Sequence, residues 1–284
     1  MNSSRQNNAA FSSTELVFLL AMLALLFLPL LITWTKPRAA TRSIICLRNH
    51  HQLIQAWLMY AGDYDQQVCN NFTIPDTENA ITSGQFNNWA NNIMNWTASD
   101  GLTAQSVTNL DWVRRGVLAR YSDDPVGMVK CPADTFLSAA QRKSGWKARV
   151  RSVSMNALMG RSDSSPTSLA GRAWVDTTLR QFLRLSDIPD PERTWVTSDE
   201  HPDSINDGFF IALPNQTLWS DLPGSYHDGM CTYSFADGHT ELHPWRSRNT
   251  KKPVTFTYAG GAFDSAARKD YRWLLDHSAF IPFR

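Results

Sequence analysis

The sequence predicts an α+β fold in which a long amino-terminal helix packs on an antiparallel β-sheet with loop-rich insertions. Two observations carry this prediction. An unbroken apolar run, Leu16–Ile32, continues into helical spacing of apolar residues as far as Ala61, which predicts a long helix. Later in the chain, apolar and polar residues alternate on both sides of Asp237-Gly238, which predicts a β-hairpin.

Composition places the chain among folded proteins and excludes one class of partner. The chain has 284 residues, of which 43% are hydrophobic and 19% are charged. These values are typical of a folded protein with a sizeable core. The formal net charge of +1 lacks the basic excess of a nucleic-acid-binding protein, so no nucleic-acid partner is expected.

The chain contains four cysteines, which are widely spaced: Cys46, Cys69, Cys131 and Cys231. No two of them form a Cys-x-x-Cys pair, so a zinc site built on cysteine is not expected. An even number allows one or two disulfides if most of the chain is exported. Free buried thiols are the equal alternative, and the sequence leaves the pairing open.

The first predicted element is one helix from about Ser12 to Met59 or Ala61. Gly62 provides a stop signal just beyond it. Pro29 lies inside the helix and should bend it, because proline removes one backbone hydrogen bond. The outer half carries an apolar stripe that needs a partner in the rest of the chain, formed by Cys46, Leu53, Trp57, Tyr60 and Tyr64.

The remaining chain shows weaker helix signals followed by strand signals. Residues 70–106 are rich in Asn, Thr and Ser and predict long loops with short helices at most. A helix is expected at Leu110–Tyr121, although Gly116 weakens it. The expected strands are Thr194–Ser198, Gly208–Leu213 and a hairpin in which Cys231, Tyr233 and Phe235 alternate with Thr232, Ser234 and Ala236 around a two-residue Asp237-Gly238 turn.

The carboxyl-terminal tail is expected to begin as a short helix that packs Trp273 and Leu274. Residues 251–264 carry no clear signal.

The apolar run is long enough to predict a membrane span. A helix needs roughly 20 residues to cross a hydrocarbon core of about 30 Å, and Leu16–Thr35 meets that length. A cleaved secretory signal fits poorly, because the run is long and Arg38 precedes the small pair Ala39-Ala40. A carboxylate, Glu15, stands directly before the run. The basic residues after the run would by themselves favour a cytoplasmic location for that side: Lys36, Arg38, Arg42 and Arg48.

The stretch Ala10-Phe-Ser-Ser-Thr-Glu15-Leu16, followed by an apolar run, resembles the processing signal of type IV pilins and type II secretion pseudopilins. The resemblance implies that prepilin peptidase cuts between Ala10 and Phe11 and that the new Phe11 amine is methylated. Glu15 becomes the fifth mature residue and would pair with the Phe11 amine of a neighbouring subunit. The family usually has Gly where this chain has Ala10, and apolar residues where it has Ser12, Ser13 and Thr14.

Further segments resemble a group of bacterial prepilin-like proteins. That group carries a histidine, nine residues and then Asp-Gly near its carboxyl end, and His227 with Asp237-Gly238 matches this spacing. The other matching segments are Cys46–Leu53, Trp57–Tyr60, Lys130–Asp134, Arg151–Asn156, Leu185–Ile188, Asp199–Phe210 and Phe235–His239.

The resemblance implies four regions: a leader at residues 1–10, a filament-core and transmembrane segment at 11–35, the outer half of the helix at 36–64, and a globular head at 65–284. It implies a structural subunit of a type II secretion pseudopilus, not an enzyme. Expected partners are further copies of the chain, prepilin peptidase and other secretion-system or pilus components. The chain would span the bacterial inner membrane once, with a cytoplasmic amino terminus and a periplasmic head. A type IV pilus subunit for adhesion or DNA uptake is the alternative within the family.

A polar cluster late in the chain contains the candidate metal ligands Asp199, His201, Asp203 and Asp207. Oxygen-rich clusters suit calcium, and histidine with carboxylates suits a transition metal. By analogy with major pseudopilins a structural calcium ion is a hypothesis, and no other cofactor is expected. The alternative is a network of turns in which Asp and Asn side chains cap their own backbone.

Two other functions compete with the structural one. A hydrolase could use His227 with Asp237 or Asp199, with Ser225 nearby, but no Gly-x-Ser-x-Gly, His-Glu-x-x-His or phosphate-binding glycine loop is present. A carbohydrate-binding surface could use some of the 11 tryptophans, since aromatic rings stack on sugars. Tryptophan is more often a core or interface residue, and exposed coplanar rings would distinguish the two.

Overall fold

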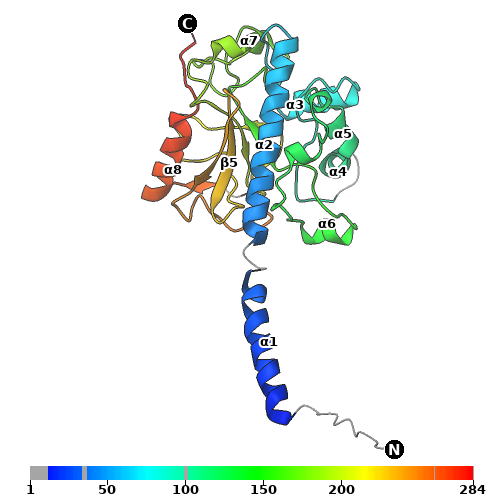
Figure 1. Ribbon diagram of the computed structural model, residues 1–284. Coiled ribbons are helices and arrows are strands. Elements are labelled where there is room, and N and C mark those ends of the chain that lie inside the picture. The colour runs from blue at the N-terminus through cyan, green and yellow to red at the C-terminus, as the bar shows by residue number, and fades with distance from the viewer. Residues whose placement is uncertain (1–11, 34–36, 99–101, 259, 284) are drawn as a thin grey trace, which may run out of the picture. The chain divides into compact units, whose positions relative to one another are not determined.

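The computed structural model describes residues 12–33, 37–98, 102–258 and 260–283. The chain divides into two compact units, Met1–Thr41 and Arg42–Arg284. The helices are α1 Ser13–Thr33, α2 Pro37–Asp63, α3 Ile74–Thr82, α4 Leu102–Thr108, α5 Leu110–Arg114, α6 Ala139–Lys143, α7 Pro166–Leu169 and α8 Ser265–Asp276 (Figure 1). The strands are β1 Val153–Asn156, β2 Trp195–Asp199, β3 Phe209–Phe210, β4 Leu218–Trp219, β5 Met230–Phe235, β6 Thr240–Pro244 and β7 Gly261–Ala262.

Helix α1 begins with a reciprocal capping box. The Ser12 backbone N–H donates to Glu15 Oε2 at 2.9 Å, and the Glu15 N–H donates to Ser12 Oγ at 3.3 Å. This exchange satisfies backbone donors that the first turn of a helix leaves open. The Ser-Ser-Thr-Glu stretch is therefore a helix start, and Glu15 contributes to it locally.

Apolar side chains of α1 between Leu16 and Leu26 are exposed. Among the described residues, no helix is both long enough and apolar enough to span a membrane. The predicted span Leu16–Thr35 extends into residues 34–36, which lie outside the described part, as do Ala10 and Phe11.

Helix α2 buries the predicted apolar stripe. Cys46, Leu53 and Trp57 are fully buried, whereas Tyr60 is half-buried and Tyr64 is 40% exposed. The helix begins at a proline, a residue favoured in the first turn, and ends at Asp63, slightly beyond the predicted end.

The predicted single helix is described as two helices, α1 and α2, with Pro29 inside α1. Its continuity through residues 34–36 stays a prediction.

The main sheet is mixed, not purely antiparallel as predicted. It has five strands in the order β3-β1-β2-β5-β6, and every neighbouring pair is antiparallel except β1–β3. The chain reverses after β1 and again after β2, and β3 then joins the far edge of β1, so these two strands run the same way. Strand β1 was not predicted. Its sequence, Val-Ser-Met-Asn, alternates apolar and polar residues, but the run is only four residues long and is a weak strand signal by itself.

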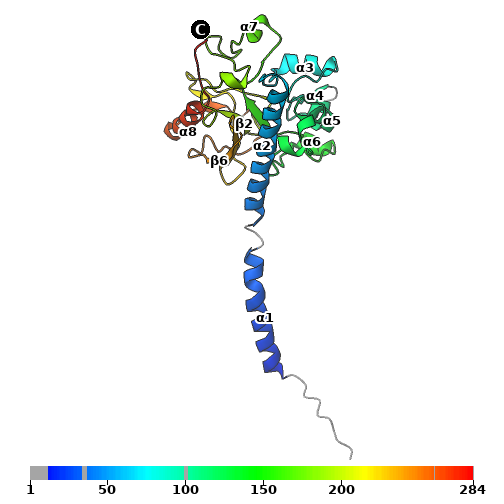
Figure 2. The ribbon, with the colours of Figure 1, turned by 45° about the horizontal axis from the view of Figure 1, so that its top comes forward.

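The two faces of the sheet contact different helices (Figures 1 and 2). Toward α8, the rings of Trp195, Tyr233 and Phe235 join Tyr271 and Leu274 in one aromatic core. Toward α2, the sheet presents apolar side chains such as Met155, which shares a core with Leu53 and Trp57, and also polar side chains. Thr197 Oγ1 lies 3.1 Å from His50 Nδ1, and Thr232 Oγ1 donates to Cys46 Sγ at 3.3 Å. Helices α2 and α8 therefore cover opposite faces, and the α2 face carries the polar groups.

The β5–β6 hairpin is confirmed, but its turn is longer than predicted. The Gly238 N–H donates to Phe235 O at 2.9 Å, and the Phe235 N–H donates to His239 O at 3.0 Å. Gly238 has φ of +100°, so residues 236–238 form a turn that closes with a left-handed glycine. A Cβ on Gly238 would lie 3.0 Å from Gln55 Nε2 and 3.2 Å from Leu58 Cδ1, so the turn rests directly on α2.

The remaining predictions hold in part. The predicted helix at Leu110–Tyr121 is split into α5 and a 3-10 turn at Ala119–Tyr121, with Gly116 between them. Strand β2 matches its prediction closely, whereas β3 covers only two residues of the predicted Gly208–Leu213. Helices α3 and α4 occupy parts of the loop-rich region, and α8 is longer than expected because Asp264 caps it from the 251–264 segment.

Candidate functional site

Four side chains with metal-binding donor atoms meet inside the second unit: Cys46, Cys131, Asp199 and His227. We call them the buried donor cluster. Their donor atoms all lie within 4.8 Å of one another. His227 is the most exposed of the four, at only 3%. The cluster is therefore sealed from solvent.

Each member reaches the cluster from a different part of the fold. Cys46 comes from α2, and Asp199 is the last residue of β2. Cys131 follows a 3-10 turn and is fixed by its backbone N–H, which donates to Ser152 Oγ at 2.7 Å. His227 lies just before β5 and pairs through its backbone with Met230. The cluster thus joins α2 to the sheet and to two loops.

Two short contacts pair the members of the cluster, one between Cys46 and Asp199 and one between Cys131 and His227. Cys46 Sγ lies 3.2 Å from Asp199 Oδ2, and Cys131 Sγ lies 3.3 Å from His227 Nε2. His227 Nε2 is also 3.9 Å from Asp199 Oδ2, too far for a hydrogen bond. On the outer side, His50 Nε2 stands 3.4 Å from Asp199 Oδ1. Two sulfurs, one ring nitrogen and one carboxylate oxygen therefore face one another at short range.

The environment shifts the pKa of the two thiols in opposite directions. Burial raises the pKa of Cys46 well above its ordinary value, with Asp199 adding to the effect. Burial also acts to raise the pKa of Cys131, but hydrogen bonds with Cys46 and His227 lower it overall. The pKa of His227 is raised, because its contact with Cys131 outweighs burial. Cys131 is consequently the more acidic thiol, next to a basic imidazole.

This arrangement does not match a nucleophile–base–acid triad. In such a triad the acid holds the ring nitrogen opposite the nucleophile. Here Cys131 Sγ and Asp199 Oδ2 both approach Nε2 of His227. The residues are also buried, so a substrate has no access to them. Donor atoms that converge in this way fit the coordination of an ion better than the activation of a nucleophile.

The other predicted metal ligands are not part of the cluster. His201 Nε2 lies 2.9 Å from Lys252 O. The carboxylate of Asp203 accepts backbone N–H bonds from Thr255 and Phe256, and Asp207 accepts one from Phe209. Asp207 caps its own turn, as the turn-network alternative predicted, whereas Asp203 and His201 contact a loop that is distant in the sequence. Of the four candidates, only Asp199 meets other donors at the cluster.

The His227 and Asp237-Gly238 motif divides between two places. His227 belongs to the cluster, whereas Asp237 accepts the His239 backbone N–H at 3.1 Å inside the hairpin turn. Both ends face α2, at Cys46 and at Gln55 respectively. The motif therefore anchors β5 to α2 at two points. Asp237 is not paired with His227, so that version of the predicted hydrolase site is wrong.

Sequence reasoning missed both cysteines of the cluster as site residues. All four cysteines are free and buried, so the buried-thiol alternative describes the structure and the disulfide alternative does not. The sequence did carry one signal that could have identified them: Cys46 and Cys131 both lie in segments that resemble the prepilin-like group. Spacing could not reveal them, because Cys131 and His227 are 96 positions apart.

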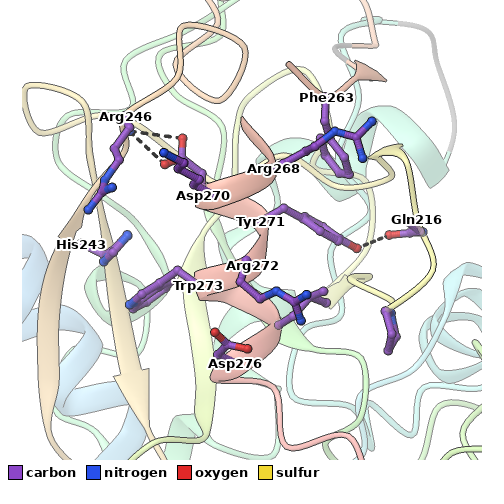
Figure 3. Close-up of a pocket in the computed structure, with 13 residues that line it drawn as sticks. Gln216, His243, Arg246, Phe263, Arg268, Asp270, Tyr271, Arg272, Trp273 and Asp276 are labelled. Atoms are coloured by element: carbon purple, nitrogen blue, oxygen red, sulfur yellow. Dashed lines mark hydrogen bonds between the residues drawn. The ribbon is translucent and has the colours of Figure 1, made fainter. Parts of the chain in front are cut away.

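A surface cleft of about 610 Å³ lies beside α8, on the other face of the sheet (Figure 3). Three of its side chains are engaged in the fold. Asp270 accepts backbone N–H bonds from Arg246 and Ser247, and Tyr271 Oη donates to Leu213 O at 2.9 Å. His243 stacks on Trp273 with ring centroids 3.6 Å apart. These contacts give Asp270, Tyr271 and His243 a structural role.

His243 predicts a pH dependence of stability. Burial lowers its pKa to about 4, whereas an unfolded histidine has a pKa of about 6.5. Unfolding therefore takes up a proton between these values, and the free energy of unfolding should fall as the pH drops from about 6.5 to about 4. His243→Phe keeps the ring stack and should flatten this part of the profile in urea unfolding. At pH 8 both side chains are uncharged, so a difference there reports packing alone; an unchanged slope between pH 6.5 and 4 would contradict the assignment.

Tryptophan burial gives no support to a sugar-binding face. Among the described residues, Trp174 is the one tryptophan with a largely exposed ring, at 50%. Trp57, Trp195 and Trp219 are fully buried, and Trp245 is nearly so. A flat array of exposed rings is absent from the described part of the chain.

Comparison with known proteins adds no relative. No protein-family model, no curated protein and no solved structure matches this chain.

Proposed function

We propose that this chain is a structural subunit of a pilus-like filament of the type II secretion kind. One observation carries the proposal: a capped helix, α1, with exposed apolar side chains belongs to a different unit from the folded head. Exposed apolar surface of this extent requires another apolar partner. In a filament, the α1 helices of neighbouring subunits would provide that apolar partner.

The start of α1 is compatible with the proposed processing. A cut between Ala10 and Phe11 leaves Ser12 in the chain, so the capping box with Glu15 is retained. It also places the new amino group one residue before the cap. The cleavage site itself lies outside the described residues, and the cut remains a proposal based on sequence.

Glu15 can serve both the helix start and the assembly. Its hydrogen bonds from Ser12 both go to Oε2. We propose that Oε1 receives the Phe11 ammonium group of a neighbouring subunit. Such a pair would offset the cost of placing a carboxylate beside apolar surroundings and would fix the register between subunits. The proposed location is the bacterial inner membrane for the precursor, with the head periplasmic.

We expect Glu15→Gln to be cleaved normally but to be lost from filaments. Glutamine at this position keeps the capping box, because its side-chain oxygen can accept the same N–H bond. It removes the charge that pairs with the Phe11 amine. Incorporation should fall at least about tenfold, the effect of roughly 1.4 kcal/mol per contact. The measurement is the amount of variant in sheared filaments, with mass spectrometry of the mature amino terminus.

Ser12→Ala is the matched control, because it weakens the capping box and keeps the charge. It should enter filaments nearly as well as the unaltered chain. Equal loss in both variants would assign Glu15 to the helix start alone. An intact Met1 in the unaltered chain would remove the processing step and with it the proposed function.

A further inference from the structure

The donor atoms of the buried donor cluster are spaced like the ligands of a coordination sphere. For zinc bonds of about 2.0–2.3 Å in a tetrahedron, neighbouring donor atoms stand about 3.3–3.8 Å apart. The measured separations are 3.2 Å for Cys46 Sγ to Asp199 Oδ2, 3.3 Å for Cys131 Sγ to His227 Nε2, and 3.9 Å for His227 Nε2 to Asp199 Oδ2. All the donor atoms lie within 4.8 Å of one another. Only small shifts of the donors are therefore needed to hold an ion.

Asp199 provides an independent indication. Its side chain is fully buried, and Oδ1 has no hydrogen-bond partner. His50 Nε2 stands 3.4 Å away and is also without a hydrogen bond, so the two atoms face each other without a good bonding angle. A buried carboxylate with an unsatisfied oxygen is costly unless a cation or a hydrogen bond compensates it. A cation on Oδ2 would neutralise the carboxylate to which this oxygen belongs, while Oδ1 stays beside His50.

The donor types select one class of metal. The cluster offers two sulfurs, one imidazole nitrogen and one carboxylate oxygen, all ligand types that zinc binds, usually four at a time in a tetrahedron. Calcium prefers an all-oxygen shell with more donors, so the calcium hypothesis does not fit these residues. Because four protein ligands fill the tetrahedron, no position remains for a water or a substrate. The site would be structural.

We propose that the buried donor cluster binds one Zn²⁺ ion, which fastens α2 to the sheet. The ligands are Cys46 Sγ, Cys131 Sγ, Asp199 Oδ2 and His227 Nε2. On binding, the two thiols release their protons to the solvent, and the sulfurs bind as thiolates. His50 lies beside Asp199 Oδ1 and orients that carboxylate from the outer side. The proposal does not depend on filament assembly.

The ion would also explain why His227 and Gly238 of one motif both face α2. The zinc would fix the chain at the start of β5 to Cys46, and the turn at Gly238 packs on Gln55 further along the same helix. Two attachments prevent the helix from sliding along the sheet. Leu53 and Trp57 add apolar packing further along the helix, whereas the contacts of Cys46 itself are polar.

Metal analysis of the full-length chain, purified in mild detergent with a reducing agent and no chelator, tests the proposal. We expect about one zinc per chain. After removal of zinc, added Co²⁺ should produce a thiolate-to-cobalt charge-transfer absorption together with the intense d–d bands of a tetrahedral site. Cys131→Ser and His227→Gln should lose the stoichiometric zinc and this absorption. Cys69→Ser is the matched control, because Cys69 is equally buried but lies outside the cluster.

His50→Ala tests the outer contact and should weaken zinc binding about 10–100-fold in competition with a chromophoric chelator. Three results would overturn the proposal: no zinc and no cobalt band in the unaltered chain, a mass two hydrogens lower that maps to a Cys46–Cys131 disulfide, or equal zinc in Cys131→Ser and Cys69→Ser. The cobalt spectrum of the unaltered chain decides the matter even if a ligand variant fails to fold.

Discussion

Asp134→Ala is expected to destabilise the protein by about 3–5 kcal/mol, because it leaves a buried arginine without its counter-ion. Asp134 Oδ2 lies 3.1 Å from Arg149 Nη2, and both side chains are fully buried. Lys130 Nζ approaches the same oxygen at 2.7 Å. Burial acts to raise the pKa of Asp134, but Arg149 and then Lys130 hold it below its ordinary value. Urea unfolding of the full-length chain in detergent measures the loss.

An exposed pair provides the control for that substitution. Arg114 and Asp111 form an ion pair with side chains that are 52% and 79% exposed. Arg114→Ala should change the free energy of unfolding by less than about 1 kcal/mol, since solvent screens such pairs. The contribution of Asp134 to the free energy of unfolding should also depend on pH. Because the pKa of Asp134 is lowered in the fold, this contribution should be present above about pH 4 and disappear as the pH falls below that value. Equal effects of the two substitutions would contradict the role of burial.

Trp195→Ala is expected to cost about 3–5 kcal/mol through the cavity it leaves. The ring is fully buried between Phe210 and Tyr233, with centroid distances of 5.5 Å and 5.7 Å in edge-to-face contact. Its Nε1 also donates to Ser278 Oγ at 2.9 Å, so the substitution leaves a buried hydroxyl without this donor. The same unfolding experiment, followed by near-ultraviolet circular dichroism, reports the loss of this aromatic core.

Trp174→Ala removes the same side chain from an exposed position. Trp174 is 50% exposed and makes an edge contact with Phe209 at 6.0 Å. We expect a loss of no more than about 1 kcal/mol. A loss comparable to that of Trp195→Ala would show that the aromatic core around β5 is not the main source of stability.

The aromatic core and the proposed zinc site lie on opposite faces of one sheet. Toward α8, the sheet gains stability from buried rings such as Trp195 and Tyr233. Toward α2, Thr197, Thr232 and Asp199 provide hydrogen bonds and candidate metal donors. Met155 on the same face also joins Leu53 and Trp57 of α2 in a second apolar core. Both helices therefore pack on apolar cores, and α2 makes specific polar contacts in addition at Cys46.

Local signals in the sequence predicted the local structure well. The apolar stripe with Leu53 and Trp57 identified the buried face of α2, because helical spacing places these residues on one side. Alternation around Asp237-Gly238 identified the β5–β6 hairpin, because a strand turns successive side chains to opposite faces. The turn is longer than predicted, because Asp-Gly occurs in more than one type of hairpin turn. The register in which β5 pairs with β6 decides which type forms.

Strand order and the parallel β1–β3 pair depended on contacts between distant segments. No short motif encodes which edge of β1 the later strand β3 joins. The short β1 alternates apolar and polar residues over only four positions, which is too short a run to identify a strand by itself.

By itself the sequence determined the helix stripe, the helix start near Ser12 and the hairpin, each of which depends on neighbours within a few residues. Only the tertiary structure decided that Cys46 meets Asp199, which is 153 positions away, and that both meet Cys131 and His227. A metal-binding arrangement depends on donor atoms converging in space, and here each donor comes from a separate segment. The fold brings them together because α2 crosses the polar face of the sheet where β2 ends and β5 begins.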